Sequence, residues 1–127
     1  MATAAQYAST VRTAQGQVSA ANTNRNGTGT IVTVFTAGAN GSRIDDIYIT
    51  ATGTVTAGVV RLYLNDGTNT YLWKENLVTA VTPSTTVAVF QTVLLNQALI
   101  LQSGWSLRAS TNNAETFNIQ VTRAGDF

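Results

Sequence analysis

Short runs of alternating apolar and polar residues, separated by turn-forming residues, fill the sequence from residue 27 onward. Because successive side chains of a strand point to opposite faces, this period of two predicts strands with one buried face. In the run VVRLYLN the residues predicted to face the core are Val60, Leu62 and Leu64, and those predicted to face solvent are Arg61, Tyr63 and Asn65. No helical period of useful length competes with the alternation, which therefore predicts an all-β fold.

The alternating runs predict about eight strands. Their expected ranges are Thr30 to Thr36, Arg43 to Ala51, Val59 to Asn65, Thr70 to Leu77, Thr86 to Leu94, Leu99 to Gln102, Ser106 to Ser110 and Phe117 to Arg123. Many short strands at such spacing are typical of an antiparallel β-sandwich, and we expect a jelly-roll-like sandwich domain over residues 27–127.

Residues 1–26 differ from the rest because they hold few large apolar side chains and many Ala, Thr, Gln, Ser and Asn residues. Such a composition buries too little apolar surface to offset the entropy lost on ordering. Tyr7, Val11, Ala14 and Val18 nevertheless fall at a spacing compatible with a helix. We therefore expect an extended N-terminal arm, either a disordered tail or a short amphipathic helix that forms on a partner, and a body that folds without it.

The charge of the 127-residue chain argues against several partners. Charged residues make up 10% of the sequence and the net charge is +1, so no strong field attracts nucleic acid or an anionic membrane. No run approaches the roughly 20 apolar residues of a membrane helix, and the N-terminal segment lacks the apolar core of a signal peptide. We expect no nucleic-acid or membrane partner and synthesis in the cytoplasm of a cell.

The sequence holds neither Cys nor His, which removes thiolate chemistry together with the commonest general base and metal ligand. Asp45 and Asp46 are adjacent carboxylates, but neighbours in a strand point to opposite faces and do not converge on one cleft. The apolar phase of Ile44 also differs from that of Ile47, which indicates a bulge or a strand that begins after the pair. We interpret the pair as charges that keep a strand edge soluble, and we expect a non-enzymatic protein without metal or cofactor.

Two aromatic residues form a candidate binding platform. Tyr71 and Trp73 share one face if the alternation holds through their strand. An exposed pair would stack on a sugar or anchor a protein partner, whereas a buried pair would belong to the core. Both interpretations remain open from the sequence.

Four segments carry a resemblance to a known class of proteins: LQSGWSLRAST (101–111), TAGANGSRI (36–44), TAGVVRLYL (56–64) and the ending RAGDF (123–127). They resemble small proteins encoded among the structural genes of tailed bacteriophages, and these look like head auxiliary proteins of the decoration or cement class. The resemblance covers most of residues 27–127. It implies a β-sandwich or jelly-roll body that assembles on a capsid lattice and bridges neighbouring major capsid proteins.

The resemblance predicts a capsid decoration protein on the exterior of the virion, made in the host cytoplasm, whose partners are the major capsid protein and further copies of itself. Avidity favours a homo-oligomer, with a trimer preferred to a dimer. The candidate anchors on the arm are Tyr7, Val11 and Val18, with Arg12 as a polar contact at the rim. Two alternatives are a tail, neck or fibre component and a carbohydrate-binding module that uses Tyr71 and Trp73.

Overall fold

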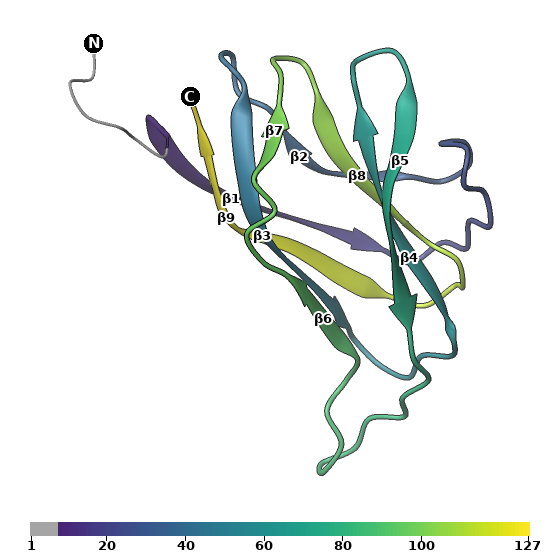
Figure 1. Cartoon of the computed structure of the whole chain (residues 1–127). Helices are drawn as coiled ribbons and strands as arrows, with labels where there is room; N and C mark the ends of the chain where they lie inside the picture. The colour runs from purple at the N-terminus through teal and green to yellow at the C-terminus, as the bar shows by residue number, and fades with distance from the viewer. Residues whose placement is uncertain (1–7) are drawn as a thin grey trace.

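The computed structural model describes residues 8–127, which form two facing antiparallel sheets (Figure 1). The strands are β1 (Thr10–Val18), β2 (Val32–Thr36), β3 (Ser42–Ala51), β4 (Gly58–Asn65), β5 (Thr70–Val78), β6 (Gln91–Leu94), β7 (Leu99–Leu101), β8 (Ser106–Thr111) and β9 (Phe117–Asp126). The first sheet has the order β1-β9-β3-β6, with β7 also paired to β3, and the second has the order β2-β8-β4-β5. This confirms the predicted all-β sandwich, while the jelly-roll-like topology stays a prediction.

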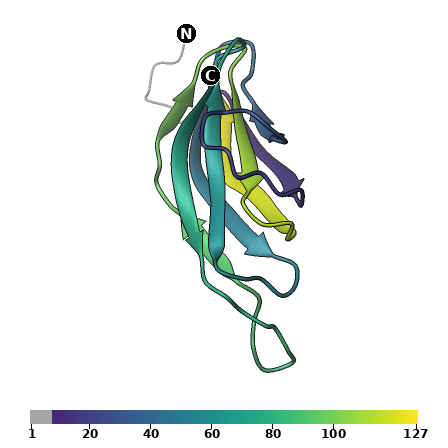
Figure 2. The ribbon, with the colours of Figure 1, turned by 90° about the vertical axis from the view of Figure 1, so that its right-hand side faces the viewer.

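Each of the eight predicted runs contains a strand, and one of them is much shorter than expected. The run from Thr86 to Leu94 is a strand only over β6, because residues 79–90 form a long connection instead. Val55 and Val81 bridge the base of this connection, and the Ser84 amide donates to the Val87 carbonyl at 2.9 Å to close a turn near its tip. The connection projects beyond the two sheets at the lower end of the molecule (Figures 1 and 2).

The N-terminal segment is the main departure from expectation, because residues 10–18 form an edge strand and neither a helix nor a disordered tail. β1 pairs with β9 along its whole length, from Thr10 opposite Asp126 to Val18 opposite Phe117. Pairing satisfies the backbone groups of β1 that face β9, and Val18 is buried in the core with 2% of its surface exposed. Partnership with β9, which is distant in sequence, supplies the stabilisation that the composition of β1 lacks.

The core lies between the sheets, as the alternation in β4 predicts for Val60 and Leu62, which are fully buried. The opposite face of β4 is buried too, so the prediction that Arg61, Tyr63 and Asn65 face solvent is wrong. Residues 19–31, which connect β1 to β2, pass over the outer face of the second sheet, at the right of Figure 1. This covering segment leaves β4 with two buried faces.

Polar contacts hold the covering segment (residues 19–31) on the sheet. The Tyr63 hydroxyl donates to the Asn24 carbonyl at 3.0 Å, and Arg61 donates to the Asn22 carbonyl at 3.0 Å. Gly27 has φ of 84°, and a Cβ at this position would lie 2.4 Å from the Thr70 carbonyl oxygen. Close approach to β5 therefore requires glycine here. The result is a sandwich with one covered outer face and one open outer face.

Candidate binding surface

The open outer face belongs to the sheet β1-β9-β3-β6, and a polar seam runs along it between β1 and β9. The outward side chains that line the seam are Thr13, Gln15 and Gln17 from β1, with Asn118, Gln120 and Thr122 from β9. Gln17 donates to Asn118 at 2.8 Å, and Gln120 donates to Gln15 at 3.4 Å. These cross-strand pairs fix the amides without charge, and we call this surface the β1–β9 seam.

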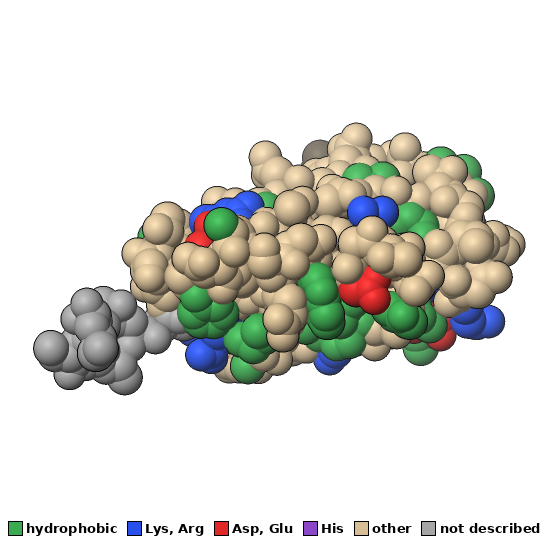
Figure 3. Space-filling model, turned by 90° about the horizontal axis from the view of Figure 1, so that it is seen from above, with side chains coloured by type: hydrophobic (Ala, Val, Ile, Leu, Met, Phe, Trp, Pro, Cys, Tyr) green, Lys and Arg blue, Asp and Glu red, His purple; other side chains and the backbone are tan. Residues whose placement is uncertain are grey.

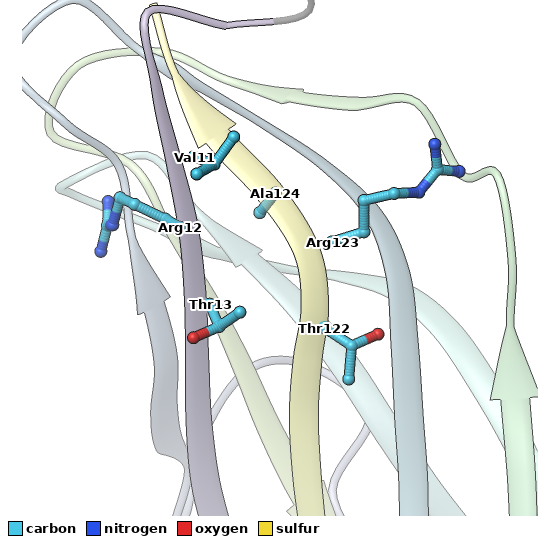
Figure 4. A pocket seen from close by; sticks show the side chains of 6 residues that line it. All are labelled: Val11, Arg12, Thr13, Thr122, Arg123 and Ala124. Carbon is cyan, nitrogen blue, oxygen red and sulfur yellow. The ribbon is translucent and has the colours of Figure 1, made fainter.

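A groove of about 720 Å³ opens at one end of the seam (Figure 4). Its lining consists of Val11, Arg12, Thr13, Thr122, Arg123 and Ala124. The strand register explains its position. Arg12 pairs with Ala124 and Ala14 pairs with Val121, so that β9 carries one more residue than β1 in this interval. Such a bulge bends the strand and separates the neighbouring side chains, which leaves the space that forms the groove.

Both arginines of the groove direct their charges away from it. Arg12 donates to Asp126 at 2.9 Å and to the Thr36 carbonyl at 2.8 Å, and its guanidinium lies 4.2 Å from the centre of the Phe35 ring. Arg123 donates to Asp46 at 3.0 Å. Figure 4 shows the two guanidinium groups pointing in opposite directions from the strands. The groove therefore presents a neutral interior.

The structure separates the residues that the sequence grouped as arm anchors. Val11 is exposed over 80% of its surface and borders the groove, so it remains available to a partner. Val18 is a core residue, and the expectation that it acts as a surface anchor is wrong for this structure. Arg12 is held within the protein by its contacts to Asp126 and Phe35. Tyr7 lies outside the described residues.

The predicted aromatic platform is divided by a bulge in β5. Leu62 pairs with Lys74 whereas Tyr63 pairs with Leu72, so the period of two is interrupted at Trp73. Trp73 is partly buried against the core, and the Lys74 ammonium lies 5.2 Å from the centre of its ring. Tyr71 stays 55% exposed. The alternation that would place both rings on one face is therefore not kept.

Asp45 and Asp46 do not lie on a strand edge, because β3 is flanked by β9 on one side and by β6 and β7 on the other. The predicted bulge is present, since the register between β3 and β9 shifts on both sides of Asp46. Asp45 is buried and accepts from the Ala98 amide at 3.1 Å, while Asp46 accepts from the Asn96 amide at 3.0 Å. The two carboxylates thus fix the β6–β7 connection through two of its backbone amides.

Positive φ values in that connection explain why it needs such contacts. Asn96 has φ of 53° and Ala98 has φ of 49°. Asparagine tolerates the left-handed region because its short polar side chain can bond locally, whereas alanine adopts this region at a cost. The hydrogen bonds that the aspartates accept from the Asn96 and Ala98 amides offset this cost. The interpretation of the pair as solubilising edge charges is therefore replaced by a structural role inside the sheet.

Four carboxylates have a lowered pKa because neighbouring donors stabilise their ionised forms, and three of them, Asp46, Glu75 and Asp126, lie beside an arginine. A hydrogen bond from Arg123 is the main cause of the lowered pKa of Asp46, and the hydrogen bond from the Asn96 amide is the second cause. The Ser42 hydroxyl donates to Asp126 at 2.6 Å, and this hydrogen bond is the main cause of the lowered pKa of Asp126. A hydrogen bond from Arg12 lowers that pKa further. Arg25 and then Arg61 lower the pKa of Glu75. All three serve as fixed anionic partners in the fold.

The surface elsewhere is largely neutral. Figure 3 looks at the end of the sandwich opposite the projecting connection and shows mostly uncharged polar surface, with hydrophobic side chains between a few charges. Within residues 8–127, no group of three or more His, Cys, Asp or Glu side chains is arranged to hold a metal ion. That same part of the chain has no helix with the length and apolarity needed to cross a membrane.

Large apolar side chains are exposed near the projecting connection. Leu77, at the end of β5, is 78% exposed, and Val87, within residues 79–90, is 47% exposed. We call the region formed by Leu77 and the connection 79–90 the projecting end. Pro83 lies in this connection, where a missing backbone donor breaks no strand pairing.

Comparisons with known proteins find similarity at the level of solved structures. No family model and no curated protein matches the chain. Two crystal structures of a pentameric capsid protein isolated from metagenomic phage sequences are similar to it, with TM-scores of 0.40 and 0.38 and sequence identities of 17% and 18%. Each alignment covers 86% of this chain but only 59% and 60% of those chains.

Proposed function

We propose that this protein is a non-enzymatic structural component of a bacteriophage particle, and more specifically a decoration protein on the exterior of the capsid. The exposed apolar side chains of the projecting end carry the proposal. The resemblance of four sequence segments to head auxiliary proteins supports it independently. The major capsid protein is the proposed partner.

The projecting end has the properties of a contact between proteins. Single exposed aliphatic residues are common on protein surfaces, but here Leu77 lies at the end of β5, where the connection begins, and Val87 lies within the connection that extends beyond the sheets. Burial of each against a capsid subunit would contribute about 1.5 to 3 kcal/mol at most. One copy would thus bind weakly through these residues.

Weak contacts favour an assembly with several copies. Linked copies make each later contact effectively intramolecular, which raises the overall affinity without new contacts. We therefore infer a homo-oligomer, with a trimer at local threefold positions preferred to a dimer at twofold positions. Virion assembly would place this oligomer on lattice positions of matching symmetry.

The test is saturable binding of purified protein to undecorated capsids, followed by sedimentation and measurement of the bound ratio. We expect a fixed ratio to the capsid protein and a higher temperature of capsid disruption. Leu77→Ser combined with Val87→Ser should weaken binding. Ile100→Ser is the matched control, because Ile100 is 49% exposed on β7, away from the projecting end.

The outcomes separate the two virion roles. Equal binding by the double variant and the control would show that the projecting end is not the contact. Failure of the unchanged protein to associate with capsids at any salt concentration would exclude decoration. Such a failure would favour a tail, neck or fibre component, which copurification with isolated tails would then test.

A further inference from the structure

We propose that the β1–β9 seam binds a neutral oligosaccharide, a function that goes beyond attachment to a capsid. Three adjoining depressions follow the two strands from Val11 to Gln17, with volumes of about 720, 450 and 360 Å³. Together they form a continuous path along the open face. An extended chain of sugar units is the ligand that fits this shape.

The amides of the seam match the hydroxyl groups of sugars. A side-chain amide offers two donors and an oxygen with two acceptor sites, and each amide pair of the seam uses one donor and one acceptor. Gln15 and Gln120 thus retain capacity to bind a ligand, as do Gln17 and Asn118. Because the pairs already fix the side chains, a ligand loses less free energy to their ordering.

The groove at the end of the seam complements the apolar face of a sugar ring. Pyranose rings carry apolar C–H faces beside their hydroxyl groups. Val11, which is 80% exposed, provides aliphatic surface at this end, and Thr13 and Thr122, each with a methyl group, line the same groove further along the strands (Figure 4). One path therefore offers apolar contact at one end and amide contacts further along.

Charge favours a neutral ligand over an acidic polymer. Arg12 and Arg123 are the cations nearest the groove, and each is committed to a carboxylate, Asp126 and Asp46 respectively. Both guanidinium groups point away from the groove (Figure 4). Nucleic acid binds proteins largely because rows of Lys and Arg side chains neutralise its phosphates. The seam has no such row of cations among its described residues, so it is a poor site for a polyanion.

Backbone pairing argues against an added peptide strand as the occupant. A peptide that extends a sheet binds through the free backbone groups of an edge. Along the seam, the facing backbone groups of β1 and β9 pair with each other from Thr10 to Val18, and the free edge of β1 lies on its opposite side, away from the seam. Recognition must therefore come from side chains. Tyr48, opposite Gln120 in the β3–β9 register and partly exposed, adds an aromatic ring on the same face.

The experiment measures binding of the purified full-length protein, without capsids, to neutral hexasaccharides by calorimetry and by ligand-observed NMR. The probes are cellohexaose, maltohexaose and chitohexaose in its N-acetylated form, with a hyaluronan hexasaccharide as the acidic comparison. We expect at least one neutral probe to bind and the acidic probe to bind more weakly. Capsid binding, measured separately, does not affect this result.

Variants locate the site. Gln15→Ala combined with Gln120→Ala should weaken binding roughly tenfold, because two amide contacts are lost. Thr13→Trp should block the groove while keeping those amides. Gln102→Ala is the matched control, since Gln102 is an exposed glutamine in the turn after β7. Thermal melting of each variant confirms that it is folded.

Three results would overturn the proposal. The first is absence of binding to all the neutral probes at millimolar concentration. The second is binding that the folded Thr13→Trp and double glutamine variants leave unchanged. A preference for the acidic hexasaccharide would also contradict it, because the seam is argued to be neutral.

Discussion

Deletion of residues 1–20 tests whether β1 is part of the folded body. The sequence predicts that this deletion leaves the body folded, whereas the structure leads us to expect a substantial loss of stability. The deletion removes Val18, whose burial contributes about 1.5 to 3 kcal/mol. It also uncovers the side of β9 that pairs with β1, and with it apolar residues such as Ile119.

The expected decrease in the free energy of unfolding is therefore roughly 2 to 4 kcal/mol, if the loss of ladder hydrogen bonds and the gain of chain entropy approximately cancel. This is a large part of the 5 to 15 kcal/mol that is typical of a domain. With a urea m-value of about 2 kcal/mol/M, the midpoint should fall by about 1 to 2 M.

Urea denaturation followed by tryptophan fluorescence measures this shift, since the body keeps Trp73 and Trp105. Deletion of residues 1–7, which leaves β1 intact, is the matched control. Val18→Ala in the full chain should account for about 2 kcal/mol of the effect through its lost methyl groups. If the longer deletion melted cooperatively at an unchanged midpoint, β1 would not stabilise the body and the reasoning would be refuted.

Three further predictions concern the core and three carboxylates of the first sheet. Leu62→Ala should cost about 2 to 5 kcal/mol, because Leu62 is fully buried between the sheets, and chemical denaturation measures this. Asp45→Asn should be more destabilising than Asp46→Asn, since Asp45 is buried and holds the Ala98 amide; equal effects would contradict the role assigned to it. Asp126 has a folded-state pKa below its unfolded value, so its stabilising effect is present above pH ~4 and is lost as pH falls through the folded pKa. Asp126→Asn should therefore reduce the dependence of the urea midpoint on pH in that acidic range, and an unchanged dependence would argue against this linkage.

The strands of the body are predictable from the sequence because their signals are local. The alternation in β4 identifies Val60 and Leu62 as core residues, and the phase break at Ile44 identifies the bulge in β3. The same rule fails at Trp73, where a bulge in β5 shifts the period. A bulge depends on the register of two strands, which local sequence does not specify.

Most of the candidate site could not be predicted from the sequence. The segment TAQGQV, residues 13–18, alternates polar and small residues and contains the signal for a strand, but its sparse apolar content favours disorder. Its partner in β9 begins about 100 positions later in the chain. The seam exists only once these segments are adjacent, so neither segment predicts it alone.

Local periodicity and composition are sufficient to predict the all-β class, most strand positions and the neutral character of the surface. Which faces of the sheets are open, in contrast, depends on the tertiary packing. The covering segment buries Arg61 and Tyr63 on one sheet, and no comparable segment among residues 8–127 covers the β1–β9 seam on the other. Burial of a strand face depends on what packs against it, and that contact is made between residues far apart in the chain.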